Sequence, residues 1–270
     1  MKDIRVIYYM DPICSACWAL SGVIRKLILE YGDQITFETR MGGLMPPGGW
    51  EETSEDYISS TDLAKLWDES SEYYGVPVNG KVWLTTPLDS SYVAGIAYKS
   101  AVLQDEQKAN RFLRLMQEKL FVESEDISNP ILISRLAESV GLDSSLLAKD
   151  MDSRGKTAFQ EDLKLMYELE VPLFPTLFFY NSMGEYRMLD NVHPYEDFEK
   201  LLLELNPDLV KRQYLKEPEK LLSYYETLTL KDYMILTGCS RNEAEQELNK
   251  LVKNHSAKRI DSTHGSLWTI

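Results

Sequence analysis

Hydrophobic residues near the N-terminus change their period twice within forty positions. Residues 4–9 form an apolar run typical of a buried strand, and Asp11-Pro12 breaks regular structure after it. Between residues 20 and 31 the apolar side chains recur every three or four positions, which places them on one face of a helix. Residues 35–41 alternate between apolar and polar side chains. The pattern therefore predicts strand, helix and strand, with a right-handed parallel crossover.

A segment rich in glycine and proline, residues 41–50, follows without any periodicity and is predicted to be a loop. Two interpretations of this loop remain open. In one, Met45 and Trp50 contact a substrate. In the other, the loop is a well-packed connection.

Residues 55–169 have the spacing of successive helices. Asn129-Pro130 and Asp143 are typical helix N-termini. Residues 79–83 are an exception, because Asn-Gly followed by Lys-Val-Trp predicts a turn and a short extended piece. We expect a large helical segment between two groups of strands.

Strand patterns return at residues 176–180 and 186–189, separated by a turn. His193-Pro194 then begins an amphipathic helix that ends before Asn206-Pro207. His193 is interpreted as part of this helix entry and not as an acid or base. The whole arrangement predicts an α/β fold.

The last sixty residues predict a separate small unit. After a charged linker at 208–217, the pattern indicates a helix over 230–236, a second helix opened by the capping box Ser240–Glu243, and a hairpin over 258–270. Helix, turn, helix and hairpin are the layout of a winged helix. The second helix begins with glutamates, and residues 231–270 carry six basic and five acidic residues. DNA recognition needs a positive field, so we predict a protein-interaction or packing module.

Two cysteines carry the candidate chemistry. Cys14 lies where the first strand passes into the helix, and Cys17 lies one turn further on. Unpaired N–H groups and the helix dipole favour a thiolate at the first position, and the second sulfur can close a disulfide with it. We therefore predict a redox pair in which Cys14 attacks and Cys17 resolves. The alternatives are two small buried side chains or half of a zinc site.

A zinc site would need a second pair of ligands. The remaining candidates are Cys239, His193, His255 and His264, and none of them forms a close pair in the sequence. We expect no bound metal and no cofactor. Cys239 is predicted to be a small buried residue. A metal-stress sensor that uses all three cysteines is a further alternative.

The net charge of −14 and the absence of a basic run argue against nucleic acids and anionic membranes as partners. No apolar stretch approaches the length of a membrane span. Met1-Lys2-Asp3 leads directly into a strand, without the apolar region of a secretory signal. Because three cysteines are too few for a disulfide framework, we expect a cytoplasmic protein.

Three segments resemble the DsbA-like class of thioredoxin-fold proteins: 11–18 with the cysteines, Phe174-Pro175-Thr176, and 194–198. The resemblance implies a thioredoxin-fold domain (1–45 and 165–206) and an inserted helical domain (46–164). The winged-helix-like α+β extension (207–270), which the local pattern predicts, departs from the plan of this family. The resemblance also implies that Pro175 is cis and lies beside the cysteines. Phe174, Pro175 and Thr176 would hold an extended substrate, and Trp18 would shield one side of the pair and contact the substrate there. The alternative for Pro175 is an ordinary proline at a strand start.

Two functions remain open. The first is thiol–disulfide oxidoreductase or isomerase activity on protein thiols and disulfides. Ser15-Ala16 lacks the histidine of strongly oxidising DsbA-like proteins, so a more reducing potential than theirs is expected. The second follows from a whole-chain resemblance to bacterial adaptors of this class, which hand the regulator Spx to the ClpXP protease. The C-terminal extension, which catalysis does not need, favours this second function.

Overall fold

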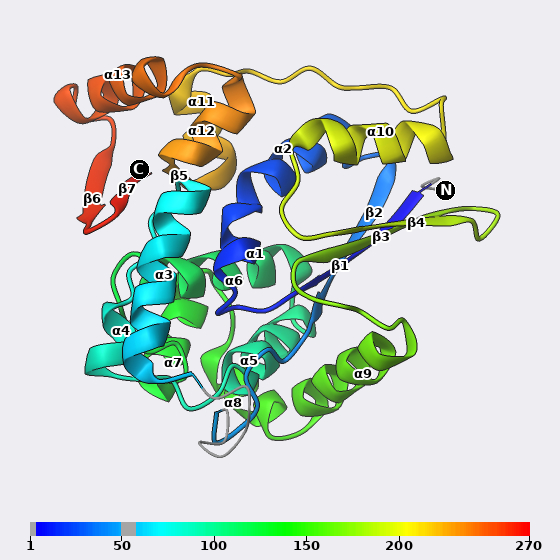
Figure 1. Ribbon diagram of the computed structural model, residues 1–270, viewed down its shortest axis with the longest axis vertical. Helices are drawn as coiled ribbons and strands as arrows, with labels where there is room; N and C mark the ends of the chain where they lie inside the picture. The colour runs from blue at the N-terminus through cyan, green and yellow to red at the C-terminus, as the bar shows by residue number, and fades with distance from the viewer. Residues whose placement is uncertain (1–3, 50–57) are drawn as a thin grey trace.

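A four-stranded sheet organises the computed structural model, which describes residues 4–49 and 58–270 (Figure 1). Trp50 of the predicted loop lies outside these residues. The strands, in the order in which they lie side by side, are β2 (Ile35–Met41), β1 (Ile4–Met10), β3 (Thr176–Asn181) and β4 (Tyr186–Asp190). β2 is parallel to β1, whereas β3 and β4 are antiparallel to their neighbours. The predicted strands and the parallel connection between the first two are confirmed.

The helix predicted after the cysteines is two helices. These are α1 (Ser15–Ala19) and α2 (Ser21–Tyr31). They meet at Leu20, whose carbonyl accepts hydrogen bonds from the N–H groups of both Val23 and Ile24. This change in the hydrogen-bond pattern at Leu20 separates the helical turn that carries the cysteines from the longer helix that packs on the sheet.

Helices cover both faces of the sheet because the side chains of β1 alternate between two cores. α2 and α10 (Tyr195–Leu205) lie on one face, where Phe198 packs against Phe179 with ring centroids 6.2 Å apart. α9 (Arg154–Glu168) covers the opposite face, where its apolar residues pack against Tyr9 and Phe178 (Figure 1). The candidate site lies at the end of β1, between these layers and the inserted helices.

The insertion between β2 and β3 is helical, as predicted. Its helices are α3 (Ser60–Tyr74), α4 (Lys81–Thr85), α5 (Tyr92–Val102), α6 (Glu106–Phe121), α7 (Pro130–Ser139), α8 (Ser144–Met151) and α9. The extended piece predicted at 79–83 is wrong, since α4 begins at Lys81. A Cβ atom on Gly80 would lie 2.1 Å from the carbonyl oxygen of Ala64. Close packing of this segment against α3 therefore decides its conformation.

The C-terminal extension contains one more helix and one more strand than predicted. Its elements are α11 (Pro218–Tyr225), β5 (Thr227–Thr229), α12 (Leu230–Thr237), α13 (Arg241–Lys253), β6 (Lys258–Ser262) and β7 (Gly265–Thr269). The two predicted helices, the capping box at Ser240 and the hairpin are present. β5 is only three residues long and pairs with β7. A pairing between such distant segments leaves no periodic signal in the sequence.

The extension has its own apolar core but is joined firmly to the rest of the chain. Asp232 of α12 is buried and accepts hydrogen bonds from Ser21 at 2.9 Å, Arg114 at 2.9 Å and Arg25 at 3.3 Å. These partners lie on α2 and α6, so one carboxylate connects three parts of the fold. No helix within residues 4–49 and 58–270 has the length and apolar character needed to cross a membrane.

Candidate active site

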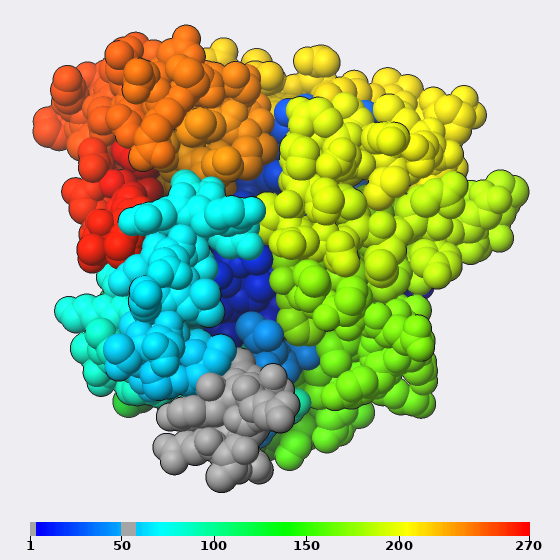
Figure 2. All heavy atoms as spheres, viewed as in Figure 1, coloured from blue at the N-terminus to red at the C-terminus, as the bar shows by residue number. Residues whose placement is uncertain are grey.

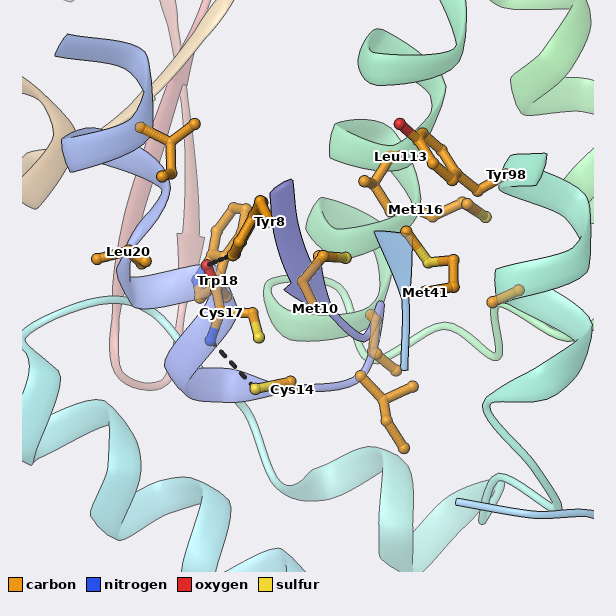
Figure 3. Packing of buried hydrophobic residues seen from close by; sticks show 14 of the residues in the cluster. Tyr8, Met10, Cys14, Cys17, Trp18, Leu20, Met41, Tyr98, Leu113 and Met116 are labelled. Carbon is orange, nitrogen blue, oxygen red and sulfur yellow. Dashed lines mark hydrogen bonds between the residues drawn. The ribbon is translucent and has the colours of Figure 1, made fainter. Parts of the chain in front are cut away.

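Cys14 is the N-cap residue of α1. Its backbone is extended (φ −78°, ψ 110°), and the N–H of Cys17 donates a hydrogen bond to its Sγ at 3.2 Å (Figure 3). The N–H of Cys14 itself closes a turn on the carbonyl of Asp11 at 3.1 Å. The predicted placement of the two cysteines at a strand-to-helix junction is confirmed.

Both cysteines are buried, and Cys17 is the more deeply buried of the two, with 2% of its surface exposed against 6% for Cys14. Burial raises the pKa of its thiol well above the ordinary value, and the neighbouring Cys14 raises it further. The hydroxyl of Tyr8 donates to the carbonyl of Cys17 at 3.5 Å (Figure 3). Both cysteines are free thiols. The pair is thus a dithiol whose second member is protonated at neutral pH.

The segment 173–176 lies beside Cys14, as the resemblance predicted. The Phe174–Pro175 peptide bond is cis, and the Sγ of Cys14 lies 3.6 Å from the carbonyl oxygen of Phe174. Pro175 is buried, and Phe174 is half-buried. Thr176 is fully buried, and its hydroxyl donates to the carbonyl of Leu173 at 2.7 Å. The Thr176 side chain therefore holds the segment in place and does not offer a contact to a substrate.

Trp18 does not lie on the open side of the pair. It has no exposed surface, and its ring stacks on Phe121 of α6 with centroids 5.6 Å apart. Its Nε1 donates to the carbonyl of Pro77 at 3.0 Å, and the guanidinium of Arg114 lies 4.0 Å above its ring. The predicted substrate contact through Trp18 is wrong, because packing against the helical insertion covers the apolar surface of the Trp18 side chain.

Asp11 is a site residue that sequence reasoning treated only as a breaker of the first strand. It is buried, and its carboxylate accepts hydrogen bonds from the N–H of Ile13 at 3.0 Å, the N–H of Leu44 at 2.8 Å and the hydroxyl of Ser91 at 2.8 Å. Burial raises its pKa, and these hydrogen bonds oppose the increase. Asp11 thus joins the cysteine turn to the 41–49 loop and to the start of α5.

The loop after β2 packs closely around the site. Met45 is buried, which supports the interpretation as a well-packed connection and removes Met45 as a substrate contact. A Cβ atom on Gly42 would lie 2.0 Å from the ring of Phe174. Only glycine leaves room for the Phe174 ring at this position. Gly42 is therefore required for the close contact between this loop and the candidate site.

The other candidate residues are not part of this arrangement. His193 pairs with Asp197 in the first turn of α10 at 3.1 Å, as expected of a helix entry. Cys239 is partly exposed, so its predicted burial is wrong, and it packs against the core of the extension, apart from the core that contains the cysteine pair. Among the described residues, no three His, Cys, Asp or Glu side chains are grouped to hold a metal ion.

The candidate site opens into a hollow. In the space-filling view, blue atoms of the N-terminal segment form the floor of a depression, at the place where α1 lies in the ribbon (Figures 1 and 2). α3 borders the depression on one side, and the chain from β3 to α10 borders it on the other (Figure 2). A segment of another protein could approach the pair from this side.

Comparisons with known proteins agree on the fold. Residues 8–200 match the family model described as Thioredoxin. A putative protein disulfide isomerase from Nitrosomonas europaea superposes with a TM-score of 0.61 at 20% identity, over 74% of this chain and 96% of that one. The cytosolic disulfide reductase DsbM from Pseudomonas aeruginosa superposes with a TM-score of 0.58 at 20% identity, over 74% and 99%. The predicted thioredoxin fold with DsbA-like neighbours is confirmed.

Curated relatives match along almost the whole chain. The protein named ClpXP adapter protein SpxH in Halalkalibacterium halodurans is 29% identical over 273 residues, covering 99% of this chain and 89% of that protein. The protein of the same name in Bacillus subtilis is 29% identical over 272 residues, again covering 99% and 89%. These matches include the C-terminal extension.

Proposed function

The chain belongs to the thioredoxin family, and from this premise we propose that it is an adaptor for the ClpXP protease that binds a regulator of the Spx type. The observation that carries the proposal is the similarity to ClpXP adapter proteins over 99% of the chain. The similarity to disulfide oxidoreductases extends over 74% of it. We place this activity in the cytoplasm, the location expected from the sequence.

The way in which the extension is attached supports this proposal. An adaptor must hold one surface for its cargo and another for the protease in a fixed relation, whereas dithiol exchange needs only the site at Cys14. Asp232 fixes the extension to α2 and α6 through buried ionic hydrogen bonds. The net charge of −14 favours partners with basic surfaces.

The test is degradation of an Spx-type regulator by ClpXP in the presence and absence of this protein. We expect the wild type to accelerate degradation, and the double variant Cys14→Ser/Cys17→Ser to retain most of this effect, because both side chains are small and largely buried. Cys239→Ser is the matched control for an unrelated thiol. If the wild type does not accelerate degradation, the adaptor proposal fails. If only the double variant fails while remaining folded, the cysteines are essential for binding the regulator.

A second candidate function is dithiol–disulfide exchange, which the geometry around Cys14 favours. The Cys14 thiolate would attack a substrate disulfide, forming a mixed disulfide and releasing one substrate thiolate. The sulfur of Cys17 would then lose its proton and attack Cys14 Sγ. The second substrate thiolate leaves, and the Cys14–Cys17 disulfide forms. An external dithiol must then reduce this disulfide. Burial raises the pKa of the Cys17 thiol, which would slow the resolving step.

The reduction potential of the pair tests this second function. We expect a value clearly more negative than the value of about −120 mV typical of DsbA, because Ser15-Ala16 supplies no cation to stabilise the reduced form. The measurement is equilibration with glutathione or dithiothreitol buffers, followed by mass spectrometry of alkylated protein. Cys14→Ser should abolish insulin reduction, and Cys17→Ser should trap a mixed disulfide. A potential near that of DsbA would contradict the expectation.

A further inference from the structure

Strand β4 forms an open edge of the four-stranded sheet. It pairs with β3 on one side and, within the part of the chain that the structure describes, with no strand on the other. The β3–β4 hairpin projects from the body of the protein (Figures 1 and 2). The opposite edge differs, because the N–H of Met41 at the end of β2 donates to the carboxylate of Asp162 of α9 at 2.9 Å. The helical insertion thus bonds the edge at β2, whereas the edge at β4 is open.

The hydrogen bonds at the two ends of the hairpin show which backbone groups of β4 face outward. The N–H of Asn191 donates to the carbonyl of Pro175 at 2.7 Å, and the N–H of Asn181 donates to the carbonyl of Glu185 at 2.9 Å. Hydrogen-bonded pairs alternate along an antiparallel ladder, so in this register the odd-numbered residues of β4 bond β3. The N–H and C=O groups that point away from β3 are therefore those of the even-numbered residues, Tyr186, Met188 and Asp190.

Most of these outward groups have no hydrogen-bond partner among the described residues. The exception is the carbonyl of Tyr186, to which the exposed guanidinium of Arg187 donates at 3.0 Å. Natural proteins usually protect such an edge with proline, lysine or a bulge. β4 contains no proline or lysine, and its five residues pair with β3 without a bulge. An edge of this kind can accept a further strand.

We infer that β4 pairs with β4 of a second copy of this chain, antiparallel, with a two-fold axis at Met188. The outward residues are spaced evenly on either side of Met188. This register therefore pairs Met188 with Met188 of the second copy, and Tyr186 of each copy with Asp190 of the other. Every outward N–H then meets an outward C=O, in a closed contact that uses the same surface of both copies. The inference does not depend on the proposed function.

The side chains along this edge suit the same partner. Tyr186 and Met188 are 55% and 45% exposed, and both lie on the sheet face that carries Phe178. The ring of Tyr186 packs on that of Tyr180 with centroids 5.5 Å apart. Two-fold pairing would place Met188 beside Met188 of the second copy, which would remove part of this apolar surface from water.

Charges do not oppose the two-fold register at close range. Arg187 would lie opposite Leu189 of the second copy, and Asp190 would lie opposite Tyr186, whose hydroxyl can donate to a carboxylate. Arg187 is also paired with Glu204 of its own chain at 3.8 Å. At longer range the two copies repel each other, since each carries a net charge of −14. Dimerisation should therefore tighten as salt is added, because salt screens this repulsion.

The experiment is analytical ultracentrifugation of the full-length protein from micromolar to millimolar concentration, under reducing conditions. We expect a reversible equilibrium between monomer and dimer that added salt shifts toward the dimer. Met188→Lys should abolish the dimer, because two lysines would meet at the axis. Ile131→Lys, at a position 79% exposed on α7, is the matched control and should leave the equilibrium unchanged. A wild type that stays monomeric throughout would overturn the inference and leave this edge to a strand of another protein.

Cross-linking tests the register directly. In a variant whose native cysteines are all serine, Met188→Cys should form a symmetric disulfide on mild oxidation, because residues of a hydrogen-bonded pair have Cα atoms about 5.5 Å apart. Arg187→Cys should not, since its counterpart lies two residues further along the strand and more than about 7 Å away, beyond the reach of a disulfide. Absence of the cross-link in Met188→Cys, or equal cross-linking of Arg187→Cys, would contradict the two-fold pairing.

Discussion

Replacing Asp232 with asparagine should lower the free energy of unfolding by about 3–5 kcal/mol, because it leaves the buried guanidinium group of Arg25 without a counter-ion and that of Arg114 with Glu118 alone. Asp232 has 1% of its surface exposed, and it binds Arg25 of α2 and Arg114 of α6. It also forms a capping box with Thr229 at the start of α12. Asparagine is almost isosteric, so the loss would report charge and not packing. Equilibrium unfolding in urea measures it.

An exposed ion pair provides the control for Asp232→Asn. Glu69 pairs with Lys65 on the surface of α3, where both side chains are more than half exposed. Glu69→Gln should therefore change the free energy of unfolding by less than about 1 kcal/mol. A loss below about 1 kcal/mol for Asp232→Asn as well would mean that the buried network does not hold the extension.

The pH dependence of the Asp232→Asn effect has a definite sign. Burial alone would raise the pKa of Asp232, but Arg114 and Arg25 outweigh burial and hold the pKa below its usual value. A group whose pKa is lower in the folded state stabilises the fold above its unfolded-state pKa of about 3.9. This stabilisation is lost as the pH falls through the folded-state pKa. The difference between wild type and variant should thus be full at pH 7 and shrink only below about pH 4.

Local sequence signals predicted the parts of this protein that depend on neighbouring residues. The cysteine turn, the capping box at Ser240, the apolar strand β1 and the alternating strand β2 are all decided within a few residues. The cis bond at Pro175 came from a family resemblance and not from periodicity. Each of these features is present in the structure. The assignment of substrate contacts to Phe174 and Pro175 stays a prediction.

Contacts between distant residues account for what the sequence did not reveal. Asp11 bonds Ser91, which is 80 residues away, and Asp232 bonds Arg114, which is 118 residues away. Neither pairing produces a pattern within a window of the sequence. The same limit applies to Trp18, because periodicity shows that a side chain lies on a buried face but not which layer covers it. The helical insertion covers it here, and this changes the role of Trp18 from a substrate contact to a structural one.

Replacing Trp18 with alanine should destabilise the protein by about 3–5 kcal/mol, the range for a buried aromatic side chain. The ring has no exposed surface, stacks on Phe121, and donates a hydrogen bond to Pro77. Trp18→Phe should cost less, since it keeps an aromatic ring beside Phe121 and loses the bond to the Pro77 carbonyl. Tyr167→Ala, at a position 74% exposed on α9, is the control and should change stability by about 0.5 kcal/mol or less. Urea unfolding measures all three.

Combining Trp18→Ala with Asp232→Asn asks whether the cysteine turn and the extension are energetically coupled. The guanidinium of Arg114 lies 4.0 Å above the Trp18 ring and bonds Asp232 at 2.9 Å, so both substitutions act on the same side chain. The two losses should therefore deviate from additivity by about 0.5–3 kcal/mol. Additivity within about 0.3 kcal/mol would contradict coupling through Arg114. Because Trp18 follows Cys17 directly, coupling of this size would give any change at the dithiol a route to the extension.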